Sequence, residues 1–432
     1  MMHAAVLGLA LAALTAQAAG VPAGAAARPT EALDVSGVHG YVRPDGGAAL
    51  AGVELIVRAG LDRQTASQNG LAALVAESVL RTPAGTPALP LADAVDARGA
   101  SIGYALGAQS VRFYLEGPPA AVAAAAPLVA AALAAPSFEP ATLTAARASL
   151  GERIADEDED ARLVGRAMLR ASFYRGGAGL PAFGNATSLA AIVPADAKAF
   201  HDRWYVRGGA AVAAVGRTGD ETAAASRTLA AALAEGSAPQ AALAVRPPGT
   251  TPKRIVTHRD LVAPYVVVGF AAPSLAERDF APALVMRALL TAVFDRPAAT
   301  SKPPAFRDGG TIYGYDVAPG QMMVWINGAR LEPQTGLAAL SAVVQTAAAK
   351  PLSAAVLGRF KETARGEWTL ETVSLDERAR AIADAVTHGL PPDAADDVRA
   401  AIGRVTASDL QRVAKKYFQK FDVALILPRS QN

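Results

Sequence analysis

The chain has 432 residues, of which 52% are hydrophobic and 19% charged, and it contains no cysteine. A chain of this length and composition forms about two to four packed units and is not a disordered protein. Its 41 basic and 39 acidic residues are spread without a basic stripe, which argues against nucleic acid as a partner. The lack of cysteine excludes disulfides, thiol nucleophiles, cysteine-ligated zinc and iron–sulfur clusters.

Residues 5–15 form a short apolar run that ends at Ala16-Gln17-Ala18, a pattern typical of signal peptidase sites. This run is too short to span a bilayer, which needs roughly 20 residues. We therefore predict a signal peptide over 1–18, a flexible lead-in over 19–32 and export to the periplasm. The alternative is an apolar N-terminus that frays. No later segment of the sequence is long and apolar enough to predict a membrane span.

The next part of the chain alternates between strand and helix patterns. Residues 53–60 alternate and are β-branched, which predicts a strand, and the apolar spacing over 70–80 predicts a helix capped by Asn69. The elements expected after these are a helix over 91–98, strands over 101–106 and 110–116, helices over 119–135, 140–172 and 194–204, a strand over 210–216 and a helix over 220–235.

The second part of the chain repeats the first. Residues 237–252 have the proline- and glycine-containing composition of a linker. The segment that ends in Asp196 matches the segment that ends in Asp409 at an offset of 213 residues, and the same offset places Trp204 on Tyr417. We therefore predict an α+β fold made by tandem duplication of one unit, with helices packed on one face of a mainly antiparallel sheet. The predicted domains are an N-terminal domain over 33–236 and a C-terminal domain over 253–432.

Several strings, in their order and spacing, resemble the insulinase/pitrilysin-type zinc peptidases, including two-domain bacterial members and subunits of the mitochondrial processing peptidase. Examples are Gly70-Leu-Ala, Phe200-His-Asp-Arg-Trp-Tyr205, and Tyr265-Val-Val-Val-Gly-Phe270. The resemblance covers nearly the whole mature chain and implies two halves that form a clam-like chamber. In catalytic members the first helix carries the motif H-x-x-E-H, which binds zinc through two histidines and activates water through the glutamate.

The zinc motif is degenerate in this chain. The resemblance aligns the first histidine with Ala73, the general base with Ala76 and the second histidine with Glu77. Only the distal carboxylate has a counterpart, Glu152. A catalytic zinc site needs three protein ligands, so we predict that this chain has no catalytic residue of its own and binds no zinc.

Each of the remaining polar residues also has a structural interpretation. Glu77 is either a solvated helix position or the partner of Arg81 four residues later, and Glu152 is either one charge on an exposed face or part of a residual metal site. The histidines after the leader have no second histidine at i+4, so we predict surface or capping roles for His39, His201, His258 and His388.

The segment from Phe306 to Tyr315 resembles the part of non-catalytic family subunits that grips substrate. The resemblance implies that Arg307 and Tyr313 bind substrate peptide, because a guanidinium and a phenol can donate hydrogen bonds to its backbone. Tyr315 faces the same side of a strand as Tyr313 and is an alternative. A purely structural role remains open, with the arginine on a loop and both tyrosines packed against a sheet.

We therefore predict a catalytically degenerate zinc-peptidase homologue that binds peptide or unfolded polypeptide as the non-catalytic subunit of a periplasmic heterodimer. Its partner would be a homologous subunit that carries H-x-x-E-H and the zinc. The alternatives are a stand-alone peptide-binding or scaffold protein and a metallopeptidase with an altered metal site.

Overall fold

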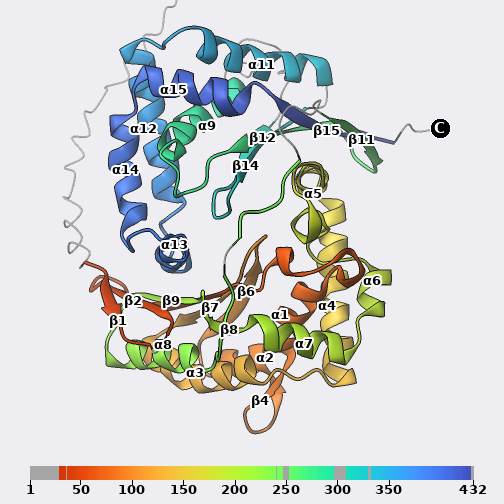
Figure 1. The fold of residues 1–432 in the computed structure, drawn as a ribbon, viewed down its shortest axis with the longest axis vertical. Helices are drawn as coiled ribbons and strands as arrows, with labels where there is room; N and C mark the ends of the chain where they lie inside the picture. Colours follow the sequence, from red (N-terminus) through yellow and green to blue (C-terminus); the bar gives the residue numbers. More distant parts are fainter. Residues whose placement is uncertain are drawn as a thin grey trace, which may run out of the picture.

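The computed structural model describes residues 29–35, 37–239, 241–246, 253–295, 308–328 and 332–429. Two halves of similar build face one another, the first below and the second above in Figure 1. Each half is built around one large β-sheet. The predicted signal peptide lies outside the described residues, as does most of the lead-in, although the chain is already in a strand at Glu31.

The first sheet has the strand order β1-β2-β9-β3-β7-β6. Only the β2–β9 pair is parallel, which confirms the predicted mainly antiparallel sheet. Its strands are β1 Glu31–Leu33, β2 His39–Pro44, β3 Ala51–Val57, β6 Ser101–Leu106, β7 Val111–Gly117 and β9 Ala211–Gly216. Two small pairs accompany it, β4 Pro83–Ala84 with β5 Leu89–Pro90, and β8 Val206–Gly208 with β10 Ala234–Ser237.

The second sheet has the order β11-β15-β12-β14-β13, and its one parallel pair is β11–β15. Its strands are β11 Arg254–Arg259, β12 Tyr265–Ala272, β13 Asp308–Gly314, β14 Gly320–Asn327 and β15 Phe421–Pro428. The parallel pair lies at the same place in both sheets, and β12 lies where β3 lies in the first. The arrangement therefore repeats at about the predicted offset.

The helices follow the same repeat. Those of the first half are α1 Leu71–Arg81, α2 Leu91–Asp96, α3 Pro119–Ala134, α4 Pro140–Glu159, α5 Ala161–Phe173, α6 Ala186–Ala191, α7 Pro194–Trp204 and α8 Asp220–Ala231. Those of the second half are α9 Phe280–Asp295, α11 Pro333–Ala349, α12 Ala354–Leu370, α13 Leu375–Thr387, α14 Ala394–Arg404 and α15 Ala407–Val413, which continues as a π-helical turn Ala414–Phe418. Short 3₁₀ turns occur at η1 Leu61–Arg63, η2 Ala66–Gln68 and η3 Gly176–Gly179.

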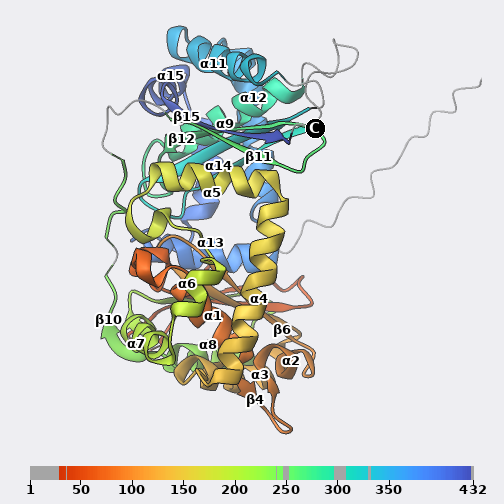
Figure 2. The same cartoon turned by 90° about the vertical axis from the view of Figure 1, so that its right-hand side faces the viewer.

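The single helix predicted over 140–172 is wrong, because the chain breaks at Asp160. The Asp160 side chain accepts a hydrogen bond from the backbone N–H of Arg162 at 2.8 Å and so caps a new helix. Figure 2 shows the result, with α4 running along the molecule and α5 turning sharply away from it.

This turn carries α5 to the other half. Val164 and Leu169 of α5 pack with Val267 and Ile426 of the second sheet. In the same way, α13 leaves the second half, and its Ile382 packs with strand residues of the first sheet. Figure 1 shows both helices between the halves, each against the sheet of the other. Each sheet is thus covered by its own helices on one face and by an exchanged helix on the other.

Each half has a large hydrophobic core of its own. Val53, Leu55 and Val57 point from β3 towards the helices of the first half, and Val266 and Val268 point from β12 towards those of the second. Burial of such side chains stabilises the fold by roughly 1.5–3 kcal/mol each. Within the described ranges, no helix has both the length and the apolar character that a membrane crossing requires.

Candidate functional site

Helix α1 carries the degenerate zinc motif and begins at a strained turn. Its N-cap is Gly70, with φ of +92°, and a Cβ there would lie 2.8 Å from Leu189 Cδ2. The first turn is completed by Gln64, whose Oε1 accepts a hydrogen bond from the Ala72 N–H at 3.2 Å. The predicted cap, Asn69, is therefore wrong, because Gly70 holds the N-cap position and Asn69 Oδ1 accepts no hydrogen bond from the described residues.

The two alanines of the motif are core residues. Ala73 and Ala76 have 0% exposure and belong to the apolar cluster between α1 and the first sheet. Their methyl groups supply neither a metal ligand nor a proton acceptor. The helix that presents zinc ligands in the resembled family is thus packed into the protein interior at these positions.

Glu77 is neutralised by its own helix. Arg81 donates from Nε to Glu77 Oε1 at 2.9 Å, which confirms the predicted i,i+4 pair, and from Nη2 to Ser149 Oγ on α4 at 3.0 Å. The alternative of a solvated position is wrong, because Glu77 is only 2% exposed. A buried carboxylate needs such a partner to offset its loss of hydration. The pair with Arg81 therefore gives Glu77 a structural role.

A second guanidinium lies close to this pair. Arg153 of α4 stacks over the Tyr104 ring at 4.6 Å and over Phe183 at 5.4 Å. Burial raises the pKa of Tyr104 well above its usual value, and the adjacent Glu77 carboxylate raises it further. The neighbouring Glu152 is exposed, as the solvated interpretation predicts. The sequence analysis did not identify Tyr104 or Arg153, and only the contact across α1 and α4 reveals them.

These residues do not fit a zinc ion. A catalytic zinc site takes three neutral or anionic ligands around an open position. Here the aligned positions supply two methyl groups, one carboxylate bound by arginine, and one exposed carboxylate. In the part of the chain that the structure describes, no group of three histidine, aspartate or glutamate side chains is placed to hold a metal ion.

One histidine differs from its prediction. His201 is buried, and its Nε2 lies 2.8 Å from the Leu133 carbonyl oxygen. Burial lowers the pKa of His201. The predicted surface or capping role is therefore wrong for His201, whereas His388 does cap α13, with Nδ1 lying 2.7 Å from the Asp384 carbonyl oxygen.

The predicted substrate-binding tyrosines lie in an aromatic cluster of the second half. Tyr313 and Tyr315 have ring centroids 5.6 Å apart, and both contact Phe280. The Tyr313 hydroxyl donates to the Pro273 carbonyl oxygen at 2.6 Å, and burial raises the pKa of Tyr313 well above its usual value. These contacts match the structural interpretation, in which the rings pack, and a role in substrate binding stays a prediction. Arg307 lies outside the described residues.

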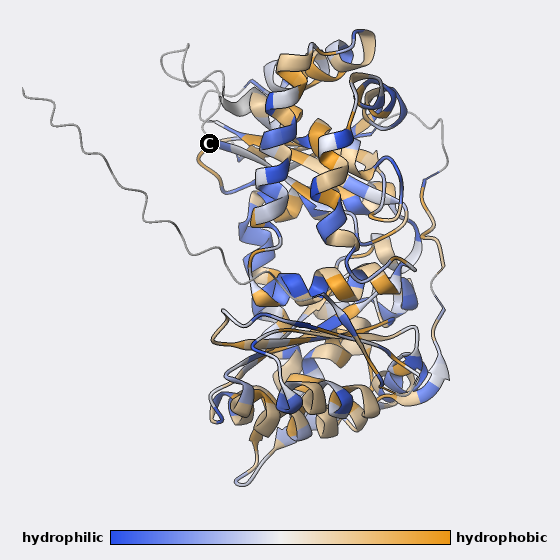
Figure 3. Cartoon of the chain, turned by 90° about the vertical axis from the view of Figure 1, so that its left-hand side faces the viewer, coloured by the Kyte–Doolittle hydropathy of each residue, from blue (hydrophilic) through white to orange (hydrophobic). Residues whose placement is uncertain are grey.

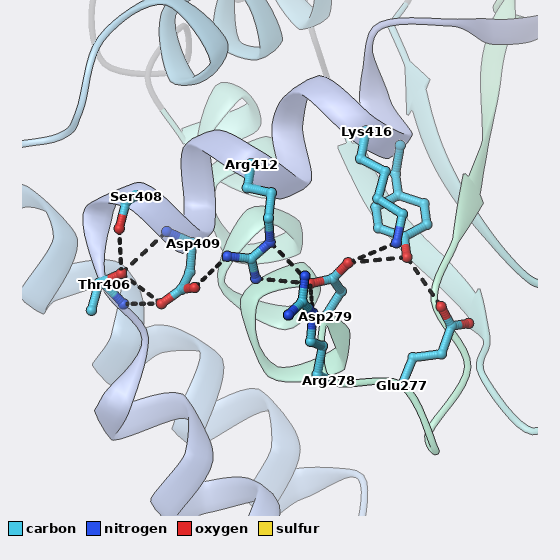
Figure 4. A network of polar contacts seen from close by, with 9 residues as sticks. Glu277, Arg278, Asp279, Thr406, Ser408, Asp409, Arg412 and Lys416 are labelled. Atoms are coloured by element: carbon cyan, nitrogen blue, oxygen red, sulfur yellow. Dashed lines mark hydrogen bonds and ion pairs between the residues drawn. The ribbon is translucent and has the colours of Figure 1, made fainter.

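The loop that accepts the Tyr313 hydrogen bond is itself fixed by a network of charges (Figure 4). Asp279, at the start of α9, accepts from Arg412 Nη2 at 2.8 Å and from Lys416 Nζ at 2.9 Å. Burial acts to raise the pKa of Asp279, but the hydrogen bonds from Lys416 and Arg412 hold it below its usual value. Arg412 also pairs at 2.5 Å with Asp409, which forms the capping box of α15 with Thr406. These contacts connect the loop beside Tyr313 to α15 and to the π-helical turn that follows it.

Each sheet ends in an edge strand that is paired on one side only. β6 pairs only with β7, and β13 pairs only with β14, among the described residues. The outer backbone groups of such a strand can accept an additional strand from another chain. β6 also lies against α1, so the free edge of the first sheet adjoins the degenerate motif.

Comparison with known proteins identifies the architecture. No family model and no curated protein sequence matches the chain. Among solved structures, the peptidase M16 inactive domain from Pseudomonas fluorescens superposes with a TM-score of 0.77 at 16% identity, covering 94% of this chain and 100% of that one. A protease from Helicobacter pylori gives a TM-score of 0.77 at 15% identity and covers 93% of this chain and 99% of that one.

A third similar structure comes from a different setting. A chain of Complex III2 from Candida albicans has a TM-score of 0.75 at 14% identity, with coverage of 93% of this chain and 95% of that one. Identities this low establish the fold alone. The chain therefore has the two-half, clam-like fold of the M16 peptidases and of their inactive domains, as the sequence resemblance predicts.

Proposed function

We propose that this chain is a non-catalytic M16-type subunit that binds extended peptide beside a homologous, zinc-bearing partner in the periplasm. The observation that carries this proposal is the contrast between an intact two-half fold and a motif helix with Ala73 and Ala76 in the core and Glu77 closed by Arg81. Because the fold is kept while the zinc ligands and the general base are lost, the proposed role is binding of peptide and partner without cleavage. The predicted leader supports the location, and the zinc would belong to the partner.

The edge of β6 is the proposed peptide-binding element. Strand addition uses backbone hydrogen bonds, so it selects an extended chain with little preference for side chains. This selectivity suits unfolded polypeptide as the substrate. Arg307 and Tyr313 would hold the same peptide from the second half, and for Tyr313 this requires that its hydroxyl exchange the Pro273 carbonyl for a substrate carbonyl.

Binding can be tested on the chain alone. We expect fluorescence anisotropy to show binding of an unstructured peptide of about twelve residues, without added metal and without cleavage. The matched control is the same peptide with alternate backbone nitrogens methylated, which cannot add as a strand and should bind at least ~10-fold more weakly. Equal binding of both peptides would refute strand addition, and zinc at one equivalent with chelator-sensitive cleavage would refute the non-catalytic assignment.

The composite site can be tested with the partner. Reconstitution with an H-x-x-E-H homologue should give peptide cleavage that neither chain shows alone. Tyr313→Phe and Arg307→Ala should each lower kcat/KM of the pair by ~10-fold or more, as loss of a donor to a polarised carbonyl does. Unchanged kcat/KM in both variants would assign these residues to packing alone.

A scaffold function is the second candidate, because the similar chain from Candida albicans is part of Complex III2. A scaffold would associate stably with other subunits, and its assembly would not depend on peptide. Size-exclusion chromatography of the native complex distinguishes the two, since a scaffold remains in a larger assembly that lacks any zinc-binding homologue.

A further inference from the structure

The strand next to the free edge of the first sheet, β7, has two faces of different character. The residues that point into the first core are buried, and they are Val111, Phe113 and Leu115. The alternate residues are half-buried and point to the face on which α13 lies, and they are Arg112, Tyr114 and Glu116. α13 packs mainly on β3 and β9, and Figure 3 shows it resting on the first sheet. The part of this face that β6 and β7 form therefore keeps exposed surface beside the helix.

Tyr114 reaches across the edge strand at a glycine. Gly103 of β6 is directly opposite Tyr114, and a Cβ on Gly103 would overlap Oη and Cζ of Tyr114 and lie 2.9 Å from its Cε2. The end of the phenol ring thus occupies the place of a side chain on Gly103. The hydroxyl lies over the edge strand and forms no hydrogen bond within the described part of the chain.

The second sheet repeats this arrangement at the equivalent place. Gly310 of the edge strand β13 is opposite Trp325 of β14, and a Cβ on Gly310 would lie 2.9 Å from Trp325 Nε1. Trp325 pairs on its other side with Val267, as Tyr114 pairs with Glu54, and Glu54 and Val267 are related by the offset of 213 residues. Both halves therefore keep a glycine on the edge strand under an aromatic ring of the next strand.

Both rings carry a hydrogen-bond donor at the end that covers the glycine. Trp325 is 9% exposed and lines a cavity of about 370 Å³, and its Nε1 forms no hydrogen bond with a described residue. A ring that only fills the space above a strand glycine needs no polar atom, so phenylalanine would serve equally well. Buried or half-buried tyrosine and tryptophan usually find a partner for their polar atom. The retained donors therefore indicate an acceptor that comes from outside the chain.

A peptide that adds to β6 would supply such an acceptor. The peptide residue opposite Gly103 would point to the same face as Tyr114, with its Cβ about 4.5–5.5 Å from the place of a Cβ on Gly103. A short side chain with an acceptor oxygen can reach the Tyr114 hydroxyl from there. An apolar side chain of the same size would remove water from the hydroxyl without replacing its hydrogen bond.

The charges on this face favour an uncharged acceptor. Burial raises the pKa of Glu54 to about 8 and also raises the pKa of Glu116. Arg112, the nearest cation along β7, already lies 3.6 Å from Glu54 Oε1. A carboxylate on the peptide would meet a face that disfavours further negative charge, whereas a hydroxyl or amide oxygen carries none.

We propose that Tyr114 is a specificity-determining residue of the peptide site at β6, where its hydroxyl donates a hydrogen bond to a short, uncharged acceptor side chain on the peptide residue opposite Gly103. Threonine, serine and asparagine are side chains of this class. The inference rests on the proposed binding of peptide at β6, and it adds one position at which the site distinguishes side chains.

The test compares two peptides of about twelve residues in which every second residue is either threonine or valine and the others are identical. Threonine and valine have nearly the same shape, and both favour strands. Their repetition brings the chosen residue opposite Gly103 in every second register, so one fixed register is not needed. Fluorescence anisotropy with the full chain gives the ratio of the two Kd values, valine peptide over threonine peptide.

Tyr114→Phe removes the hydroxyl and keeps the ring over Gly103, so we expect the Kd ratio to fall ~5-fold, as the loss of one hydrogen bond predicts. Gly103→Ala keeps the hydroxyl but displaces it from the edge strand, and we expect a similar fall. The matched control is Tyr41→Phe on β2, because Tyr41 is partly buried on the same face but lies away from β6. It should leave the ratio unchanged.

The outcomes separate this inference from the proposed function. If both peptides bind and the ratio is equal in wild type and Tyr114→Phe, the inference is overturned, strand addition stands, and the ring only covers the glycine. An equal fall in Tyr41→Phe would also overturn the assignment to Tyr114. If neither peptide binds the wild-type chain, the proposed function fails and this inference fails with it.

Discussion

The two exchanged helices occupy equivalent positions in the duplicated fold, yet they are held by different forces. α5 meets the second sheet through apolar side chains such as Val164, Leu169 and Val267. α13 meets the first sheet through a smaller apolar cluster and through buried charges that include Glu54 and Asp384. Duplication thus preserved the geometry of the junction while its chemistry diverged. One junction buries mainly apolar side chains, and the other also buries acids.

The α5 junction also contains a buried acid, Asp422, but the pKa of this acid is lowered and not raised. Asp422 of β15 accepts hydrogen bonds from Ser172 of α5 at 2.5 Å, from Arg246 Nη2 at 2.8 Å and from the Lys253 N–H at 2.8 Å. Burial acts to raise the pKa of Asp422, but these donors hold it below its usual value. Acid should therefore weaken the α5 junction, because protonation of Asp422 removes the charge that these donors stabilise.

The largest expected effect is at Gly165 of α5, which lies close to β12. A Cβ there would lie 2.4 Å from Val267 Cγ2. Gly165→Leu should force α5 away from the sheet and lower the free energy of unfolding by about 3 kcal/mol, measured by urea denaturation. The control is Gly151→Ala on α4, where an added Cβ meets nothing within 4 Å. It should be neutral or stabilising by up to about 1 kcal/mol. Similar effects of both substitutions would contradict the close contact of α5 with β12.

A smaller effect is expected from Asp422→Asn. Loss of the charge that Arg246 pairs with should cost about 2 kcal/mol at neutral pH. A lowered pKa stabilises the fold above the usual value of 3.8 and ceases to do so as the pH falls through the lowered value, so variant and wild type should converge in acid. Asp158→Asn is the control, because this exposed acid lies 3.9 Å from Arg259 and should change stability by less than about 0.5 kcal/mol. A cost at Asp422 that is independent of pH would show that its charge does not matter.

The smallest effect is expected from Ser172→Ala. It removes one donor to Asp422 and leaves the Arg246 and Lys253 donors in place, so we expect a loss of about 1 kcal/mol. Combined with Asp422→Asn, its cost should shrink, because both substitutions disrupt one network. Strict additivity in urea denaturation of the four proteins would show that Ser172 and Asp422 act separately.

The sequence predicted the duplicated architecture well, because Asp196 and Asp409 occupy the same capping position in both halves and the offset between them holds along the chain. The degenerate motif was also predictable, since Ala73 and Ala76 cannot bind metal in any conformation. The break at Asp160 was not predicted, because an aspartate in a charged helical run has the same local pattern whether it caps a helix or continues one. The burial of Glu77 depends on α4, and the hydrogen bond of Tyr313 depends on the Pro273 loop, and neither contact is local in sequence.

The exchange of helices also constrains how the protein reaches its native state. During synthesis the first half emerges before α13 exists, so the face of the first sheet around Ile56 and Ala213 lacks its cover until the second half has been made. In the same period α5 carries an apolar surface with no sheet to receive it. Neither half can therefore complete its folding alone, and a fragment cut at the linker would expose both surfaces and tend to aggregate.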